Sequence, residues 1–169
     1  MIIKNTVVLI PCAGKGTRAK LPYPKSLYKV NDKVILHRIM DSFKKFNLEF
    51  KIVINPKNIV KFKKNNIQYT HLIEYLFQRN ALGMGDAVLK ISNSKNYSKI
   101  DHIILIWGDI PFIRVKTINS MLKFHFKEGN DFTFVTGKSK NPYTYVVRDT
   151  KHNIVKVLEM KNKTKSINI

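Results

Sequence analysis

The sequence predicts an α/β fold, a mostly parallel sheet with helices on both faces. Short apolar runs alternate with amphipathic stretches of helical spacing, the pattern of repeated strand–helix–strand units. The two clearest apolar runs, 6–11 and 102–109, each end in a glycine-containing turn, which is typical of buried parallel strands. The length of 169 residues is enough for one ordinary core, and no internal repeat or linker-like segment divides it.

The elements follow from periodicity and from the residues that interrupt it. Ile35, Ile39, Phe43 and Phe46 recur at helical spacing and predict a helix over 34–46. Further helices are expected at 57–65, after the turn that Gly83 and Gly85 bracket, and at 115–127. Further strands are expected at 50–55 and 131–136, with a weaker extended segment at 67–73 and a hairpin of 143–149 with 154–160.

Composition excludes several classes of protein. An apolar fraction of 44% with ten Phe and seven Tyr excludes intrinsic disorder. No apolar run approaches the roughly 18 residues that span a bilayer, so no membrane insertion is expected. The single cysteine, Cys12, forms neither an internal disulfide nor a multi-cysteine metal site, and we interpret it as a small buried side chain in a cytoplasmic protein.

The formal charge of +20 suggests a nucleic acid or an anionic surface as partner. However, 26 of the 31 basic residues are lysines, and they are scattered along the chain rather than grouped. Specific nucleic-acid surfaces use arginine forks and stacking aromatic residues at chosen positions. We therefore interpret the charge as a solvated surface and do not expect nucleic acid as the partner.

A glycine-rich loop follows the first predicted strand. Three interpretations besides a plain tight turn compete for it. A P-loop is excluded because Gly16, not Ser or Thr, follows Lys15. A dinucleotide fingerprint is formally present as Gly14-x-Gly16-x-x-Ala19, but it must open a long helix, and Pro22 follows within about one turn. The third interpretation is a cradle in which backbone N–H groups face a polyphosphate.

The third interpretation is the one that a family resemblance supports. The run Ala13-Gly14-Lys15-Gly16-Thr17-Arg18, followed by Pro24-Lys25, resembles the signature of sugar-1-phosphate nucleotidyltransferases. The resemblance implies a Rossmann-like nucleotidyltransferase fold and a nucleotide-binding loop. By the resemblance, Arg18 and Lys25 are the catalytic cations. The nucleotide-binding residues of this loop would be Ala13, Gly14, Lys15, Gly16 and Thr17.

Two later segments resemble the same family in the same order. The segment 77–89 is similar to the base-binding segment of bacterial N-acetylglucosamine-1-phosphate uridylyltransferases, which implies that Gln78 and Gly83 bind the nucleotide base. Met84 and Asp86 stand where the family has Thr and His, which leaves the base and the sugar open. The segment 107–113 resembles the family's Gly-Asp-x-Pro motif and implies that Asp109 holds Mg²⁺.

The hairpin 143–162 resembles the family's sugar-binding region, and Glu159 aligns with an acidic residue that binds sugar hydroxyls. Thr144 and Tyr145 replace a glycine and an arginine of the family, so the sugar stays open. Family catalytic domains are longer. We therefore expect residues 1–169 to be one nucleotidyltransferase domain that lacks its C-terminal sugar-binding part.

The resemblance thus implies a Mg²⁺-dependent enzyme that couples a nucleoside triphosphate, UTP or another pyrimidine nucleotide, to a sugar-1-phosphate and releases pyrophosphate. One alternative is a nucleotidyltransferase with another phosphorylated acceptor, of the choline, methylerythritol or molybdopterin type. The other is a non-enzymatic basic domain that binds nucleic acid. The sequence does not define the oligomeric state or a second metal ligand.

Overall fold

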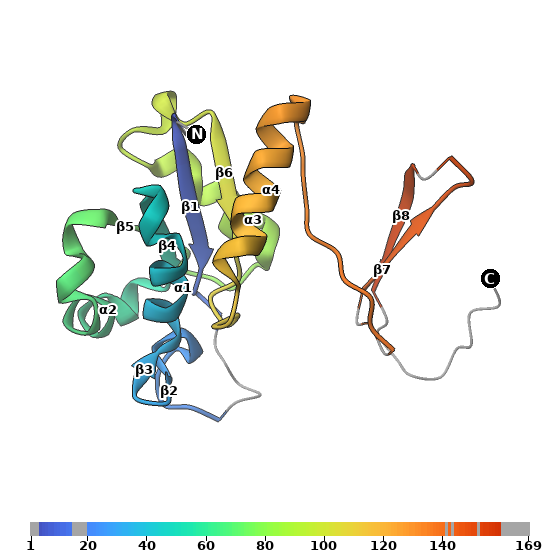
Figure 1. Ribbon diagram of the computed structural model, residues 1–169. Helices are drawn as coiled ribbons and strands as arrows, with labels where there is room; N and C mark the ends of the chain where they lie inside the picture. Colours follow the sequence, from blue (N-terminus) through green and yellow to red (C-terminus); the bar gives the residue numbers. More distant parts are fainter. Residues whose placement is uncertain (1–3, 15–19, 141, 143, 152, 160–169) are drawn as a thin grey trace. The chain divides into compact units, whose positions relative to one another are not determined.

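The computed structural model describes residues 4–14, 20–140, 142, 144–151 and 153–159 (Figure 1). The chain divides into two compact units, Met1–Asn130 and Asp131–Ile169. We describe each unit by itself. Within the described residues, no helix is long and apolar enough to cross a bilayer.

The first unit is built on a parallel sheet, as the sequence predicts. Among its described residues the sheet has four strands in the order β5-β4-β1-β6, and every neighbouring pair is parallel. The strands are β1 (Thr6–Pro11), β4 (Glu49–Ile54), β5 (Ile73–Phe77) and β6 (His102–Leu105). The α-helices are α1 (Ile35–Phe43), α2 (Ile59–Asn65), α3 (Met84–Leu89) and α4 (Val115–Glu128). Short 3₁₀ helices are η2 (Lys25–Leu27), η3 (Lys44–Phe46), η4 (Pro56–Asn58), η5 (Ile67–Leu72), η6 (Lys90–Asn93) and η7 (Tyr97–Lys99).

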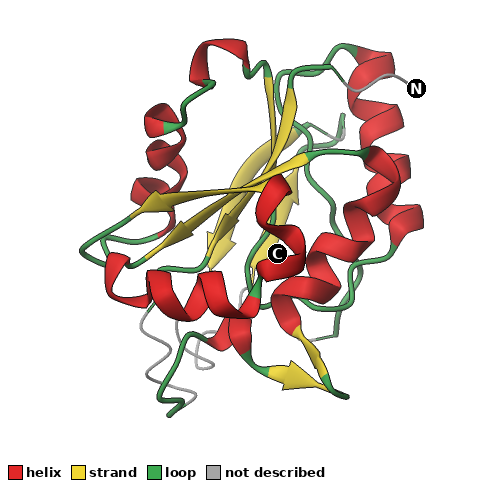
Figure 2. Ribbon diagram, turned by 90° about the vertical axis from the view of Figure 1, so that its left-hand side faces the viewer, coloured by secondary structure: helices red, strands yellow, loops and turns green. Residues whose placement is uncertain are grey.

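Helices cover both faces of this sheet, which confirms the predicted architecture (Figure 2). Successive side chains of a strand point to opposite faces, and β1 shows both. Val8 and Ile10 join one buried cluster with side chains of α1, α2 and α4. Val7 and Leu9 join a second cluster with side chains of α3 and η6. The central position of β1 therefore places the loop that follows it between two helical layers.

The helix α1 begins where a short ribbon ends. Strands β2 (Lys29–Val30) and β3 (Lys33–Val34) pair in antiparallel fashion around Asn31 and Asp32, both of which have positive φ. Such a turn matches the natural twist of a hairpin. Arg38 of α1 donates hydrogen bonds to the Val30 carbonyl oxygen and fixes the ribbon to the helix.

Two predicted strands are wrong. The segment 67–73 forms η5 instead of an extended strand, and β5 begins only at Ile73. Local hydrogen bonds explain the difference: the Tyr69 amide donates to the Asn66 carbonyl oxygen, and the Thr70 hydroxyl donates to that of Ile67. The segment 131–136 has no strand, and Phe132 is exposed. The apolar run 102–109 is a strand only as far as Leu105.

The second unit contains the predicted hairpin. Strands β7 (Thr144–Arg148) and β8 (Ile154–Glu159) pair in antiparallel fashion, with a register shift between Val147 and Arg148. Asp149 closes the turn because its carboxylate accepts hydrogen bonds from the amides of Lys151 and Asn153. Among the described residues of this unit, β7 and β8 pair with each other and none pairs with 131–136.

Candidate active site

The candidate site lies where β1 and β6 end. These strands are parallel neighbours, with Leu9 opposite Leu105, so the loops that follow them emerge at the same edge of the sheet. In open α/β sheets ligands bind at this carboxyl edge. The loop after β1 carries Cys12, Ala13 and Gly14, and the loop after β6 leads to Asp109.

Gly108 allows the two loops to pack directly on each other. A Cβ atom added at Gly108 would lie 2.5 Å from Cys12 Sγ and 2.9 Å from the Pro11 carbonyl oxygen, closer than van der Waals contact permits. The Cys12 amide in turn donates to the Val53 carbonyl oxygen at 2.7 Å, which anchors the loop to β4. This close packing holds Asp109 next to the glycine-rich loop.

Lys25 and Asp109, predicted from separate motifs, meet at this edge. Lys25 Nζ lies 2.9 Å from Asp109 Oδ2, although 84 residues separate them in the chain. Their side chains keep 50% and 41% of their surface exposed, so both remain accessible to a ligand. Lys25 is held by η2, in which the Leu27 amide donates to the Pro24 carbonyl oxygen. The site therefore presents one cation and one carboxylate side by side.

The first glycine of the loop has space beside it among the described residues. Ala13 is buried, whereas a Cβ added at Gly14 would meet no atom of the described part of the chain within 4 Å. Space at this position allows a ligand to approach the backbone. The remaining predicted loop residues lie outside the described part of the chain: Lys15, Gly16, Thr17 and Arg18.

Cys12 lies beneath this site and is chemically quiet. Burial is the main cause that raises the pKa of its thiol to about 12; the hydrogen bond with Ser26 lowers it by less, and the negative charge of Asp109 adds a still smaller increase. A thiol in this state is neutral at neutral pH and is a poor nucleophile. The structure confirms the interpretation of Cys12 as a buried side chain.

Gln78 follows β5 and is almost completely buried, with 4% of its surface exposed. Its side-chain Nε2 donates to the Gly83 carbonyl oxygen at 3.1 Å and to Asp86 Oδ2 at 2.7 Å. Both partners are pure acceptors, so they define which end of the amide is nitrogen. The orientation leaves Gln78 Oε1 as the end of the amide that can accept a further hydrogen bond.

Asp86 takes part in this arrangement as a carboxylate. The hydrogen bond from Gln78, followed by the one from Lys90 at 2.9 Å, holds the pKa of Asp86 below its ordinary value. The neighbouring Ala87 shares a buried cluster with Ala13, which places the segment 83–87 against the glycine-rich loop. Gly83 itself has φ of +98°, a backbone conformation that favours glycine.

A divalent cation would depend here on Asp109. Among the described residues, no group of three or more His, Cys, Asp or Glu side chains gathers into a metal site. A single accessible carboxylate is compatible with Mg²⁺, which is commonly held by one or two carboxylates with water and substrate phosphate oxygens. Asp109 fits that donor set in combination with a polyphosphate.

Glu159 lies at the end of β8 in the second unit and is exposed. In the hairpin register it stands opposite Thr144. Its predicted role toward a sugar stays a prediction.

Sequence reasoning missed two parts of the site. The contact of Gly108 with Cys12 and the bond between Gln78 and Asp86 both depend on side chains that meet only in the folded chain. The sequence contained one signal for the bond between Gln78 and Asp86. Asp86 stands where the family has a histidine, in the same segment as Gln78.

The parallel sheet with helices on both faces, and a cation and a carboxylate at its carboxyl edge, define an α/β domain of the kind that the nucleotidyltransferase class shares. The chain matches the MobA-like NTP transferase domain family over residues 8–166, and it belongs to that family.

Curated relatives agree with this assignment. A bifunctional protein GlmU of Buchnera aphidicola (subspecies Schizaphis graminum) is 35% identical over 94% of this chain and 33% of its own length. One of Lactobacillus johnsonii is 33% identical over 95% of this chain and 34% of its own length. This chain thus spans about a third of the length of these relatives.

The solved structures show the same fold at low sequence identity. A 4-diphosphocytidyl-2C-methyl-D-erythritol synthase from Anaerococcus prevotii superposes with a TM-score of 0.62 at 16% identity, covering 89% of this chain and 63% of that one. A nucleotidyl transferase from Methanothermobacter superposes with a TM-score of 0.56 at 13% identity, covering 70% of this chain and 56% of that one.

Proposed function

We propose that the chain transfers a nucleotidyl group from a nucleoside triphosphate to a sugar-1-phosphate and releases pyrophosphate. The observation that carries the proposal is the meeting of Lys25 and Asp109 at the carboxyl edge, beside the glycine-rich loop. A half-exposed ammonium and a half-exposed carboxylate in this place suit a triphosphate and its metal ion. Family membership and the GlmU relatives support the same reaction class.

In the proposed reaction a phosphate oxygen of the sugar phosphate attacks the α-phosphorus of the triphosphate. A new phosphorus–oxygen bond forms, the bond between the α-phosphorus and the bridging oxygen breaks, and pyrophosphate leaves with the electron pair. Such a transfer needs positioning and charge neutralisation rather than covalent help from the protein. Mg²⁺, when bound, supplies charge neutralisation on the phosphate oxygens.

Each site residue of this chain has a separate role in the proposed reaction. Lys25 Nζ, released from Asp109, neutralises charge on the α-phosphate and on the incoming phosphate. Asp109 holds the metal, and the backbone at Ala13 and Gly14 faces the phosphates. Arg18 neutralises the leaving pyrophosphate by the family resemblance. The pair in the unliganded protein keeps both charges in place until a substrate separates them.

The fixed amide of Gln78 favours a base that offers an N–H donor. With its nitrogen held by Gly83 and Asp86, Gln78 presents only its oxygen to a ligand. The N3–H of uracil and the N4 amino group of cytosine are such donors, and so are the N6 amino group of adenine and the N1–H of guanine. We propose a pyrimidine nucleotide as the substrate, with UTP first, because the segment 77–89 resembles the base-binding segment of bacterial N-acetylglucosamine-1-phosphate uridylyltransferases.

The acceptor is proposed to be a sugar-1-phosphate, with Glu159 binding its hydroxyl groups. A methylerythritol, choline or molybdopterin type of phosphorylated acceptor is the alternative within the same chemistry.

The test is pyrophosphate release by the purified full chain with Mg²⁺. Each of the four common ribonucleoside triphosphates is combined in turn with N-acetylglucosamine-1-phosphate, glucose-1-phosphate and 2-C-methylerythritol 4-phosphate. Turnover that requires both a pyrimidine triphosphate and a sugar-1-phosphate is expected. Turnover only with the methylerythritol phosphate would show that the acceptor is the alternative one and not a sugar-1-phosphate.

The variant Asp109→Asn separates the metal role from folding, because the amide is nearly the same size. We expect Mg²⁺-dependent turnover to fall by about 10²-fold or more, while nucleotide binding without metal persists. Unchanged turnover in this variant would exclude Asp109 as the metal ligand.

The net charge of +20 supports one other candidate, a domain that binds nucleic acid through its phosphates. It is tested by binding to random oligonucleotides at rising salt. Tight binding at physiological salt with no pyrophosphate release would put this candidate first.

A further inference from the structure

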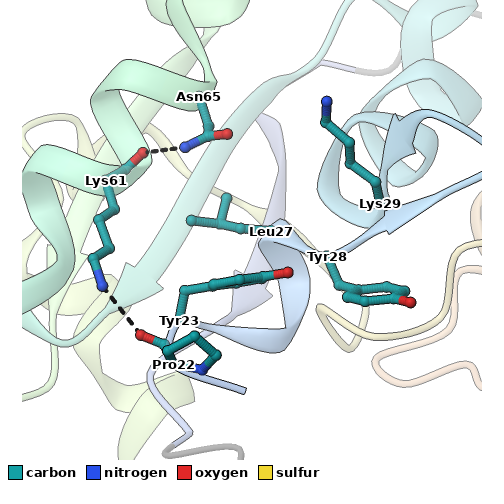
Figure 3. Close-up of a pocket in the computed structure, with 7 residues that line it drawn as sticks. All are labelled: Pro22, Tyr23, Leu27, Tyr28, Lys29, Lys61 and Asn65. Atoms are coloured by element: carbon teal, nitrogen blue, oxygen red, sulfur yellow. Dashed lines mark hydrogen bonds between the residues drawn. The ribbon is translucent and has the colours of Figure 1, made fainter.

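A cavity of about 580 Å³ opens between α2 and the segment that carries Lys25 (Figure 3). This volume falls in the range of small-molecule sites, roughly 300–1,000 Å³. Seven residues line the cavity: Pro22, Tyr23, Leu27, Tyr28, Lys29, Lys61 and Asn65. Among the described residues of the candidate active site, neither Asp109 nor Lys25 nor residues 12–14 belong to this lining, so we treat the cavity as a separate site.

The lining combines an apolar floor with a cationic rim. Leu27 is buried, and Tyr23 is partly buried and packs against the same core cluster. Lys61 and Lys29 stand on opposite sides of these residues in Figure 3. Neither lysine forms an ion pair with a carboxylate of the described residues, and the described lining residues include no acid.

We propose that this cavity is a second ligand site for a small organic anion with a flat, apolar body. The anionic group would lie between Lys29 and Lys61, because two unneutralised ammonium groups around one cavity favour a phosphate or a carboxylate. The body would lie on Leu27 and against the tyrosine rings, which offer flat apolar faces. Phenyl phosphate contains both parts in the smallest form and serves as the probe.

The occupant would also act on Lys25. Lys61 Nζ donates to the Pro22 carbonyl oxygen at 3.2 Å and so ties α2 to the start of the segment that leads to Lys25. On the other side of Lys25, Leu27 ends η2, and the Tyr28 amide donates to the Lys25 carbonyl oxygen at 3.0 Å. An anion that draws Lys61 away from Pro22 therefore loosens one of the contacts that hold Lys25 in place.

The test measures phenyl phosphate binding to the full chain by calorimetry. We expect saturable binding of one molecule, and at least tenfold weaker binding to the double variant Lys29→Ala/Lys61→Ala. The matched control is Lys63→Ala/Lys64→Ala, which removes the same total charge, here from two lysines of α2, but leaves the lining intact. Binding to the control should change less than twofold, and inorganic phosphate should bind more weakly than the probe.

Three results would overturn the proposal. Equal weakening in both double variants would show attraction to surface charge alone. Loss of probe binding in Lys25→Ala would place the probe at the active site instead. Absence of saturation would show that the cavity takes no ligand of this class.

Coupling to Lys25 has its own readout. The backbone amide resonances of Lys25 and Ser26 should shift when phenyl phosphate binds the wild-type chain and should not shift in Lys29→Ala/Lys61→Ala. Saturable binding without a change at Lys25 would refute the coupling.

Discussion

Lys25 and Asp109 form a pair whose value lies in its position rather than in its contribution to stability. Both side chains are about half exposed, and exposed ion pairs contribute little to folding, typically under about 1 kcal/mol. A residue that is needed for function but not for folding can be recognised experimentally by separating the two effects.

The variant Lys25→Ala makes that separation. We expect turnover to fall by about 10²- to 10³-fold, the usual cost of removing one charge-stabilising donor from a reaction centre. The free energy of unfolding, measured in urea, should change by less than about 0.5 kcal/mol. The control Lys127→Ala breaks another exposed ion pair, with Glu128, and should alter neither quantity. Wild-type turnover in Lys25→Ala would exclude the proposed role.

Asp86 is expected to determine base preference through Gln78. The variant Asp86→Ala removes the stronger of the two acceptors that hold the amide, at 2.7 Å. Because the amide can then turn its nitrogen toward the ligand, the preference for the favoured base over the other bases should fall by about tenfold or more. The measurement is the ratio of kcat/KM for UTP and ATP.

Lys90→Ala is the matched control for this variant. It removes the ion pair of Asp86 but keeps the bond to Gln78, so the ratio should change much less. Equal loss in both variants would show that the charge of the segment matters rather than the amide orientation.

At the scale of elements, the packing of the β1 and β6 ends rests on Gly108. The variant Gly108→Ala places a Cβ within 2.9 Å of the Pro11 carbonyl oxygen, and backbone cannot move aside as a flexible side chain can. Overpacking of this kind costs about 1–3 kcal/mol, and urea denaturation should show a loss in that range. Turnover should fall as well, because Asp109 follows directly.

Gly85→Ala serves as the control for this substitution. Gly85 lies in α3, where an added Cβ meets nothing within 4 Å. Replacing glycine with alanine in a helix gains up to about 1 kcal/mol. A loss of stability in Gly85→Ala equal to that in Gly108→Ala would contradict the steric explanation.

The elements show which parts of a fold a sequence can predict. The strand β1 and the helices α1 and α4 match their predicted ranges closely, because β1 is one continuous apolar run and the apolar residues of the two helices recur at helical spacing. The extended strand predicted at 67–73 is wrong because the turns of this segment depend on local hydrogen bonds, which the spacing of apolar residues does not reveal. The strand predicted at 131–136 is wrong because a strand needs a neighbouring strand to pair with, and strand propensity alone does not supply one.

The sequence predicted at which edge of the sheet the site lies. Residues that follow the carboxyl ends of parallel strands lie at the same edge, so Lys25 and Asp109 could be assigned to one region. Their direct contact, and the turn of Gln78 toward Asp86, depend on side-chain conformations that follow from packing of the whole unit.

For the whole molecule, stability should decline at both ends of the pH scale. On the acid side, Glu74 accepts hydrogen bonds from the buried Lys51 and from Ser94, both carried on other elements. Burial by itself would raise the pKa of Glu74, but these bonds and the charge of Lys51 hold it below the ordinary value of 4.5. The unfolded chain therefore binds this proton first, and stability is lost as pH falls below about 4.5 toward the folded-state pKa.

On the alkaline side stability also declines, but the cause is a pKa that folding raises rather than one that folding lowers. The thiol of Cys12 has a pKa of about 12 in the folded protein against 9.0 ordinarily, and burial raises the pKa of Tyr69 to about 12 as well, with a further contribution from Asp41. Between these values the unfolded chain loses protons that the folded protein keeps. Stability should therefore decline as pH rises above about 9.

Urea denaturation at pH 3.5, 7 and 10.5 checks both limbs, and the midpoint should be highest at pH 7. In Glu74→Gln the acid limb should be shallower than in the wild type. A midpoint that is constant over this range would contradict the assigned linkage.

The burial of Cys12 also gives the molecule a built-in reporter of its own opening. It is the one cysteine of the sequence, and it lies at the junction of the two loops that form the site. Thiol reagents attack the thiolate, so a buried thiol with a pKa of about 12 reacts only when the junction opens and exposes it. Labelling should be slow in the native protein, fast in concentrated urea, and slower still when a ligand bridges the loops. The labelling rate of the unmodified chain thus measures how often the site comes apart.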